Sequence, residues 1–225
     1  MSKIVHITDT HFYHSLIKQQ DTDFVIFSGD CSNPQDSFIN EQQVRDFIEW
    51  YSQYPATHKI FIAGNHDASI ERNLVTRSDF QSNGIIYLEN DWVEIEGIKI
   101  WGSPITPTYN VGWAFNRARN KTETIWKHIP DDTDIIVTHG PPKGILDLAY
   151  HDDVLEFCGD KSLLNRVLQI NPKLHLFGHI HNNGYIQNSG YTKVTGCDTI
   201  FSNATAVEDR KFTNGIINHG NVFHI

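Results

Sequence analysis

Five short apolar runs in this chain each end in a cluster of polar residues, and this pattern constrains the fold more than any other feature. The runs cover residues 4–7, 24–27, 60–63, 135–137 and 174–177. The clusters that follow them are Asp9-Thr10-His11, Gly29-Asp30, Gly64-Asn65-His66-Asp67, Thr138-His139-Gly140 and Gly178-His179-Ile180-His181. Continuous apolar runs of this length are typical of buried strands. If the strands lie side by side in one sheet, the clusters meet at its carboxyl edge, where open α/β sheets place their sites.

Apolar residues at helical spacing separate some of these strands. In residues 41–52, Val44, Phe47, Ile48 and Tyr51 recur at helical spacing, which predicts a helix between the second and third strands. A strand, a helix and a further strand in succession indicate βαβ patterning and an α/β fold. A second helical pattern, residues 163–168, ends before Pro172, which cannot continue a helix.

The middle of the chain has a different character. Residues 92–95 and 99–101 flank a turn and predict a hairpin. Residues 104–116 are rich in Pro, Trp and Asn, which predicts a surface loop. With 225 residues, 39% of them hydrophobic, the chain can bury a sizeable core and needs no second domain, so we expect one domain over residues 1–225.

The composition indicates the cellular compartment and the classes of binding partner to expect. Cys31, Cys158 and Cys197 are an odd number without CxxC spacing, so we expect neither a disulfide framework nor a structural zinc site. The formal net charge of −9 disfavours broad nucleic-acid binding. No apolar run approaches the roughly 18 residues of a membrane span, and the first residues do not resemble a signal segment. We expect a soluble cytoplasmic protein with no membrane partner, and the oligomeric state stays open.

Seven residues in the polar clusters have side chains suited to metal ions. They are Asp9, His11, Asp30, Asn65, His139, His179 and His181. Carboxylate oxygens together with neutral imidazole nitrogens favour Mn, Fe or Zn over the all-oxygen sites of Mg or Ca. Two ions at the roughly 3.5–4 Å separation of two-metal hydrolytic sites would need a bridging carboxylate. The sequence thus predicts two divalent metal ions, with Mn²⁺ expected to support activity in vitro and Fe or Zn as alternatives.

The ordered motifs DxH, GD, GNHD, THG and GHxH resemble those of the calcineurin-like metallophosphoesterase family. The residues between them, especially 59–67, 101–104 and 138–144, are similar to the branch of metallophosphoesterase-domain proteins that includes brain-expressed animal members. The resemblance implies α+β-like layers, a two-sheet β-sandwich flanked by helices, with metals at the carboxyl ends of strands. It also implies phosphate-ester hydrolysis, because members of that branch are associated with cyclic-nucleotide phosphodiesterase activity.

The same resemblance implies a role for each site residue. The first ion would be held by Asp9, His11 and His181, and the second by Asn65, His139 and His179, with Asp30 bridging. His66 would contact the phosphoryl group, as a charge stabiliser or proton donor, and Asp67 would hold the His66 ring in the required tautomer. A metal-bound hydroxide would attack the phosphorus.

The chain departs from the protein serine/threonine phosphatases of the same superfamily. Their GDxxDRG motif is replaced by Gly29-Asp30-Cys31-Ser32-Asn33, and their GNHE by GNHD. Because the arginine of GDxxDRG is absent, no residue is assigned to bind the nonreacting phosphate oxygens. Arg117 and Arg119 are candidates for substrate binding, because a guanidinium group matches a phosphate. We expect a small phosphate-ester substrate, a phosphodiester, with a cyclic nucleotide as one candidate.

Two other functions remain open from the sequence. A phosphomonoesterase acting on nucleotides or phosphoproteins would use the same ligands, and a noncatalytic scaffold would keep the fold and bind metal. The aromatic residues Trp101, Tyr109, Trp113 and Phe115 belong to the core or, where exposed, offer a stacking surface for a nucleobase. His6 and His175 lie within apolar runs, and we expect both to be core or edge residues with their polar atoms satisfied.

Overall fold

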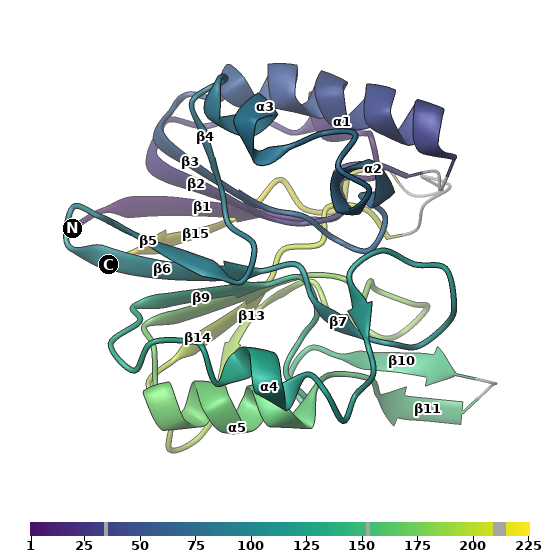
Figure 1. Cartoon of the computed structure of the whole chain (residues 1–225). Helices are drawn as coiled ribbons and strands as arrows, with labels where there is room; N and C mark the ends of the chain where they lie inside the picture. Colours follow the sequence, from purple (N-terminus) through teal and green to yellow (C-terminus); the bar gives the residue numbers. More distant parts are fainter. Residues whose placement is uncertain (34–35, 152–153, 209–214) are drawn as a thin grey trace.

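The five strands that precede the polar clusters divide between two sheets. The computed structural model describes residues 1–33, 36–151, 154–208 and 215–225. β1 (Lys3–Ile7), β2 (Thr22–Ser28) and β3 (Ala56–Ile62) lie in one sheet, and β9 (Ile135–Thr138) and β12 (Leu174–Phe177) lie in the other. Figure 1 shows the sheets face to face with helices on both outer faces. The five strands do not share one sheet, and the expected two-sheet sandwich is confirmed.

The first sheet has the strand order β15-β1-β2-β3-β4. Strands β1 to β4 (Ile85–Tyr87) are parallel, and β15 (Asn221–His224) pairs antiparallel with β1. The predicted helix is α1 (Ser37–Ser52), which connects β2 to β3. It begins before the predicted residue 41 because Asp36 caps it, accepting hydrogen bonds from the backbone N–H groups of Phe38 and Ile39. The short helices of this half are η1 (His14–Leu16), α2 (Ala68–Glu71) and α3 (Arg77–Gln81).

The second sheet has the strand order β13-β14-β12-β9-β6-β5. The predicted hairpin is present as β5 (Asp91–Ile95) and β6 (Ile98–Ser103). β13 (Gly190–Lys193) and β14 (Ile200–Asn203) complete the sheet, and α4 (Glu123–Trp126) and α5 (Lys161–Ile170) lie on its outer side in Figure 1. Helix α5 ends at Ile170 and is capped by Asn171, which has the left-handed conformation with φ 53° and lies directly before Pro172.

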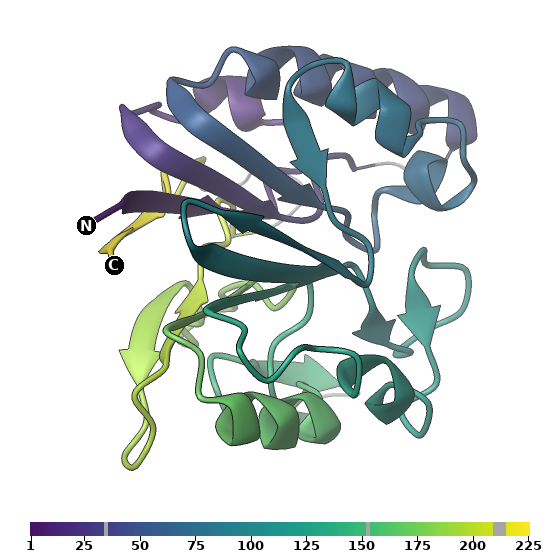
Figure 2. The ribbon, with the colours of Figure 1, turned by 60° about the vertical axis from the view of Figure 1, so that its left-hand side comes forward.

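Two small strand pairs lie on the side of the molecule opposite the two chain termini (Figures 1 and 2). β7 (Thr106–Pro107) pairs with β8 (Asn116–Arg117), so the predicted loop over residues 104–116 is bounded by short strands. β10 (Leu148–His151) and β11 (Val154–Phe157) form a separate antiparallel pair. Both pairs border the site described below.

Alternating residues of the strands build the core between and outside the sheets. Ile4, Phe24 and Ile26 of the first sheet form one buried cluster with Ile135 and Leu174 of the second. Their sequence neighbours face the helices, as expected for a period of two. Trp101 and Phe115 are also buried, which assigns them to the core.

His6 and His175 are both fully buried, in line with the sequence prediction. The two ring nitrogens of His6 lie 2.8 Å from the hydroxyls of Ser202 and Ser28, which belong to different sheets. Nε2 of His175 lies 2.9 Å from the hydroxyl of Thr138, whereas its Nδ1 has no hydrogen-bond partner among the described residues. Only His6 is therefore fully satisfied by the described side chains.

Cys31, Cys158 and Cys197 are free thiols. Within the described ranges, no helix combines the length and apolar character needed to cross a membrane.

Candidate metal centre

The seven predicted metal ligands converge where the carboxyl ends of the two sheets meet. They are Asp9 and His11 after β1, Asp30 after β2, Asn65 after β3, His139 after β9, and His179 and His181 after β12. The sheets are joined at this end by an isolated bridge between Thr8 and Thr205, and the backbone N–H of Ala206 donates to the Thr8 carbonyl at 3.0 Å. Convergence therefore depends on the packing of two sheets, not on one sheet edge.

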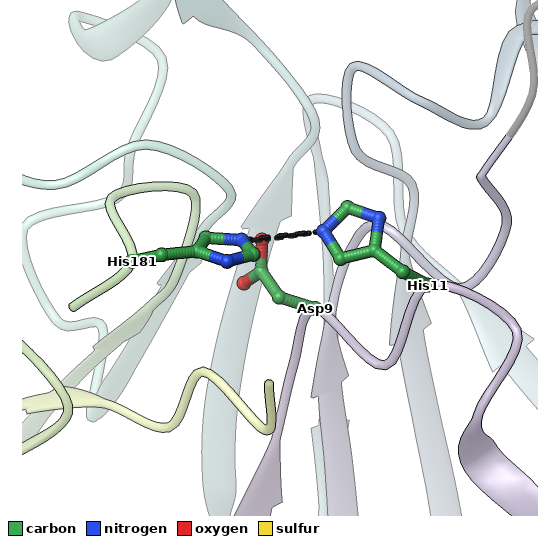
Figure 3. Close-up of side chains that lie close together, drawn as sticks. All are labelled: Asp9, His11 and His181. Carbon is green, nitrogen blue, oxygen red and sulfur yellow. Dashed lines mark hydrogen bonds and ion pairs between the residues drawn. The ribbon is translucent and has the colours of Figure 1, made fainter. Parts of the chain in front are cut away.

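Asp9, His11 and His181 form the first group of candidate ligands (Figure 3). Nε2 of His181 lies 3.1 Å from Oδ1 of Asp9 and 3.2 Å from Nε2 of His11. Nε2 of His11 lies 3.8 Å from the same carboxylate oxygen. Two imidazole nitrogens and a carboxylate oxygen thus face a common point, an arrangement that suits one divalent cation.

Asp30, His139 and His179 form a second group, and Asn65 joins it through its amide oxygen. Nε2 of His139 lies 3.3 Å from Oδ2 of Asp30 and 2.9 Å from Oδ1 of Asn65. The same Asp30 oxygen lies 3.9 Å from Nε2 of His11, which belongs to the first group. Asp30 therefore occupies the position between the two groups that a bridging ligand would need.

The charges in this cluster fit divalent cations. Asp9 and Asp30 are at most 2% exposed, and in the described part of the chain their ion pairs are with histidines alone. Burial would raise the pKa of Asp30, but the neighbouring His139 and His66 rings hold it well below its usual value. Burial lowers the pKa of His11 to about 3, which leaves this imidazole neutral, the form that binds metals. Buried carboxylates beside imidazoles form a donor set that fits two transition-metal ions.

Four of the candidate ligands have backbone conformations that L-residues rarely adopt. Asp9, His11, Asp30 and His179 have φ values of 52°, 44°, 57° and 69°. Such residues persist only where surrounding contacts determine the conformation. Here the backbone N–H of Asp9 donates to the Gly29 carbonyl at 2.9 Å, and that of His11 donates to the Asp30 carbonyl at 3.1 Å. The turns after β1 and β2 thus hold each other in place.

The glycines that precede three of the ligands act in two ways. Gly29 has φ 104°, as expected for a tight turn. Gly178, in contrast, is not left-handed, and a Cβ atom there would lie 2.0 Å from Oδ2 of Asp9. Gly64 is similar, because a Cβ atom would lie 2.3 Å from Oδ1 of Asp30. Of these three glycines, Gly29 alone has a positive φ, and the other two permit close approach of a carboxylate.

The structure corrects the role predicted for Asp67. Nδ1 of His66 lies 2.8 Å from the carbonyl oxygen of Asn33, so this carbonyl, and not Asp67, orients the ring. The Asp67 carboxylate points instead at the turns, where it accepts hydrogen bonds from the backbone N–H groups of Asp30, Gly64 and Ser32, from the Ser32 hydroxyl and from the Cys31 thiol. These N–H groups lie beyond the strand ends and lack ladder partners, which is why they attract the buried carboxylate.

A cavity of about 930 Å³ opens over the cluster. Tyr109 and Trp113 line one side, and Tyr150 and Glu156 of the β10–β11 pair line another. Arg119 also lines it and donates hydrogen bonds to the carbonyls of Cys158 and Gly159. The structure thus brings one of the two predicted substrate-binding arginines to the site.

Arg117 does not line this cavity. Its guanidinium lies 3.9 Å from the Glu71 carboxylate and donates to the carbonyl of Asn116. The structure therefore does not bring Arg117 into the cavity lining, and its contact with substrate stays a prediction.

Sequence reasoning missed the residues that support the ligands. The hydroxyl of Thr8 donates to Oδ2 of Asp9 at 2.7 Å, and its position directly before a ligand was a usable signal. Thr205 approaches the same oxygen at 3.5 Å, and the Glu208 carbonyl lies 3.3 Å from Nδ1 of His181. Neither residue lies in or next to a motif, so no sequence signal would have found them.

Comparisons with known proteins agree with the motifs and the fold. The human protein "Metallophosphoesterase domain-containing protein 1" is 32% identical over 203 residues, which cover 80% of this chain and 60% of the human protein. A protein of Emericella nidulans named "Probable rhamnogalacturonate lyase C" is 34% identical over 190 residues, which cover 79% of this chain but 17% of that protein. A solved crystal structure with 14% identity has a TM-score of 0.63 over 90% of both chains, a likeness that concerns the fold alone.

The chain therefore spans less than two thirds of either named relative. The family model for the calcineurin-like phosphoesterases matches residues 2–183, a stretch that contains all five motifs and the whole candidate metal centre. On the strength of that match, the chain belongs to the calcineurin-like phosphoesterase family.

Proposed function

We propose that this protein is a phosphoesterase with two divalent metal ions that hydrolyses a small phosphodiester. The observation that supports this proposal is the convergence of two carboxylates, four histidines and one asparagine, from both sheets, at one buried point. The family binds divalent metals and comprises phosphoesterases, which fits the donor set.

The two groups of ligands would divide the ions between them. Asp9, His11 and His181 would hold the first, and Asn65, His139 and His179 the second, with Asp30 between them. When bound, such ions supply positive charge for the phosphoryl oxygens and lower the pKa of water. The protein residues keep the ions fixed, because five of the seven ligand side chains are at most 2% exposed.

His66 is the residue that we assign to the reacting phosphoryl group. It lines the cavity, its Nε2 lies 3.9 Å from Oδ2 of Asp30, and its Nδ1 is anchored on the Asn33 carbonyl. A ring held in this way can donate a proton or a hydrogen bond from Nε2 when it is protonated. Nε2 of His66 would then face a phosphoryl group bound in the cavity over the cluster.

The charges around the cavity favour a diester over a monoester. Arg119 is the one Lys or Arg side chain among the described residues that line it, and its guanidinium already donates to two backbone carbonyls. Glu156 and Glu208 add negative charge to the same lining. A phosphate diester has one negative charge and a monoester has up to two, so this lining disfavours the monoester more.

The aromatic side of the cavity supports a substrate with a planar group, and a cyclic nucleotide is our leading candidate. The rings of Tyr109 and Trp113 are stacked, with centroids 6.1 Å apart and an interplanar angle of 30°. Tyr109 is 42% exposed, so its ring is accessible to a base. Aromatic faces of this kind bind nucleobases by stacking.

Hydrolysis assays with synthetic esters test this proposal. Metal-stripped protein would be reloaded with Mn²⁺ and assayed on bis-p-nitrophenyl phosphate and p-nitrophenyl phosphate, with Asp30→Ala protein as the blank. We expect faster turnover of the diester, followed by activity on a cyclic-nucleotide panel. Faster turnover of the monoester would instead identify a phosphomonoesterase. No turnover above the blank would favour a metal-binding scaffold.

We also propose that the protein acts in the cytoplasm. Its three cysteines are unpaired thiols, the form expected in a reducing compartment. Fractionation of cells that express the tagged protein would test this, and recovery outside the cytoplasmic fraction would contradict it.

A further inference from the structure

We propose that Tyr109 is a positioning residue for Asn65 and thereby for the second metal ion. The inference rests on the two-ion site of the proposed function. It adds a residue outside the five motifs, from the loop between β7 and β8, to the machinery that sets the geometry of the second site.

The two ends of the Asn65 amide face different partners. Nδ2 donates a hydrogen bond to the Tyr109 hydroxyl at 3.0 Å, and Oδ1 lies 2.9 Å from Nε2 of His139. Only Oδ1 has lone pairs for a cation, because the amide nitrogen is a donor alone. Asn65 is 2% exposed, so an unpaired Nδ2 would find little water. The Tyr109 hydroxyl therefore stabilises the rotamer that points oxygen at the ion.

Tyr109 also contacts a second candidate ligand. Its ring centroid lies 5.2 Å from that of His179, with an angle of 56° between the planes. One side chain thus contacts both Asn65 and His179, which reach the second site from different sheets. This double contact distinguishes Tyr109 from the other residues of the loop.

The loop that carries Tyr109 is itself tied to Asn65 and to the body of the protein. The backbone N–H of Ala114 donates to the Asn65 carbonyl at 3.2 Å, and that of Phe115 donates to the Glu71 carboxylate at 2.8 Å. At the other end, the Thr108 N–H donates to the Arg117 carbonyl at 2.8 Å. Asn65 is therefore held by the loop through both its main chain and its side chain.

Mn²⁺ binding to Tyr109→Phe protein tests this inference without any assay of hydrolysis. The substitution removes the hydroxyl and keeps the ring that packs against His179 and Trp113. We expect calorimetric titration of the metal-free protein to show two Mn²⁺ ions in wild type, and in the variant a loss of about threefold to tenfold in affinity for one of them. Electron paramagnetic resonance should show the spin-coupled Mn²⁺ pair forming at a correspondingly higher Mn²⁺ concentration.

Two control variants separate the hydroxyl from general effects. Tyr191→Phe removes an exposed tyrosine hydroxyl in β13 and should leave both Mn²⁺ affinities unchanged. In an Asn65→Ala background, Tyr109→Phe should cause no additional loss of Mn²⁺ affinity, since its partner is already absent.

The outcomes distinguish this inference from the proposed function. If wild type binds fewer than two Mn²⁺ ions, the two-ion function fails, whatever the variant does. If wild type binds two ions and Tyr109→Phe binds both with unchanged affinity, the positioning role is overturned. A raised KM for the diester with unchanged Mn²⁺ binding would make Tyr109 a substrate contact only, which also overturns it. An equal loss in the Asn65→Ala background would do the same, because the effect would not pass through Asn65.

Discussion

The His66 ring rests on the carbonyl oxygen of Asn33, which lies 2.8 Å from its Nδ1. An imidazole that donates from Nδ1 to a carbonyl presents Nε2 to the opposite side, and here that side is the buried cluster around Asp30. In the sequence, His66 stands between the candidate ligand Asn65 and the buried Asp67. The contact with Asn33 explains how its ring has a fixed orientation at the site. It also means that Asp67 is free for a different role.

Replacing His66 with Ala should slow hydrolysis without removing the metals. We expect a loss of about 10²–10⁴-fold in kcat, the usual contribution of one acid or base. The Mn²⁺ content, measured by mass spectrometry of the desalted protein, should stay near that of wild type. If His66→Ala loses an ion, His66 is a ligand in the group that it forms with His11 and Asp30, and our assignment is wrong.

Replacing Asp67 with Asn should destabilise the fold, because the carboxylate accepts five hydrogen bonds and is fully buried. An amide would turn an N–H group toward N–H donors, at a cost of about 2–4 kcal/mol in the free energy of unfolding. Urea unfolding of the metal-free protein measures this.

Asp36→Asn is the matched control for Asp67→Asn. Asp36 caps α1 at an exposed position, where Asn is an equally good cap. The urea unfolding midpoint of the Asp36→Asn protein should therefore be close to that of wild type. Equal effects of the two substitutions would contradict the role that we give Asp67.

Addition of Mn²⁺ should stabilise the protein, because the ions would bind the folded site alone. At a free concentration about 100 times the dissociation constant, each site adds about 2.7 kcal/mol. Asp30→Asn, which keeps the shape but removes the charge between the two groups, should lose most of this gain. An equal rise in Tm for wild type and variant on Mn²⁺ addition would exclude Asp30 as a shared ligand.

Mn²⁺ binding near neutral pH should release a proton from His139. Burial opposes protonation, but the Asp30 and Asp9 carboxylates raise the pKa of His139 to about 9 in the metal-free protein. Both ring nitrogens also face oxygens, the Ser28 carbonyl and the Asn65 amide. A ligand nitrogen must be unprotonated, so Mn²⁺ affinity should rise with pH up to about 9. Titration in weakly buffered indicator solution measures the release, and the absence of any proton would contradict this state of His139.

Mild acid should destabilise the protein partly through His175. Burial, with a smaller contribution from His6, lowers the pKa of His175 to about 3. The unfolded value is about 6.5. Between these values the unfolded chain binds more protons, so this stability is present above pH 6.5 and is lost as the pH falls towards 3.

His175→Gln removes this titration and leaves an amide to contact Thr138. Between about pH 7 and about pH 5, wild type should lose about 2 kcal/mol more than the variant in urea unfolding. Equal losses of unfolding free energy in wild type and His175→Gln would show that His175 is not the group responsible.

The strands and the donor atoms of the candidate site could be predicted from the order of residues along the chain. Each apolar run became a strand whose ends lie within four residues of the predicted bounds, because continuous burial demands an unbroken apolar segment. Asp9 and His139 come shortly after these runs in the sequence, so their position along the chain was enough to place them at strand ends. A set of donor atoms for divalent ions could also be predicted, since donor atoms are a property of residue type.

Which of these side chains meet, and what supports them, depends on how the two sheets and their loops pack. The five strands divide between two sheets, and nothing in an apolar run states which sheet it will join. The Asn33 carbonyl under His66 and the Tyr109 hydroxyl on Asn65 are contacts across loops. The loop after β8 brings Arg119 to the cavity, whereas Arg117 lies beside Glu71. Such contacts depend on chain packing between distant segments, and a hydrogen bond of this kind leaves no periodicity or motif in the sequence.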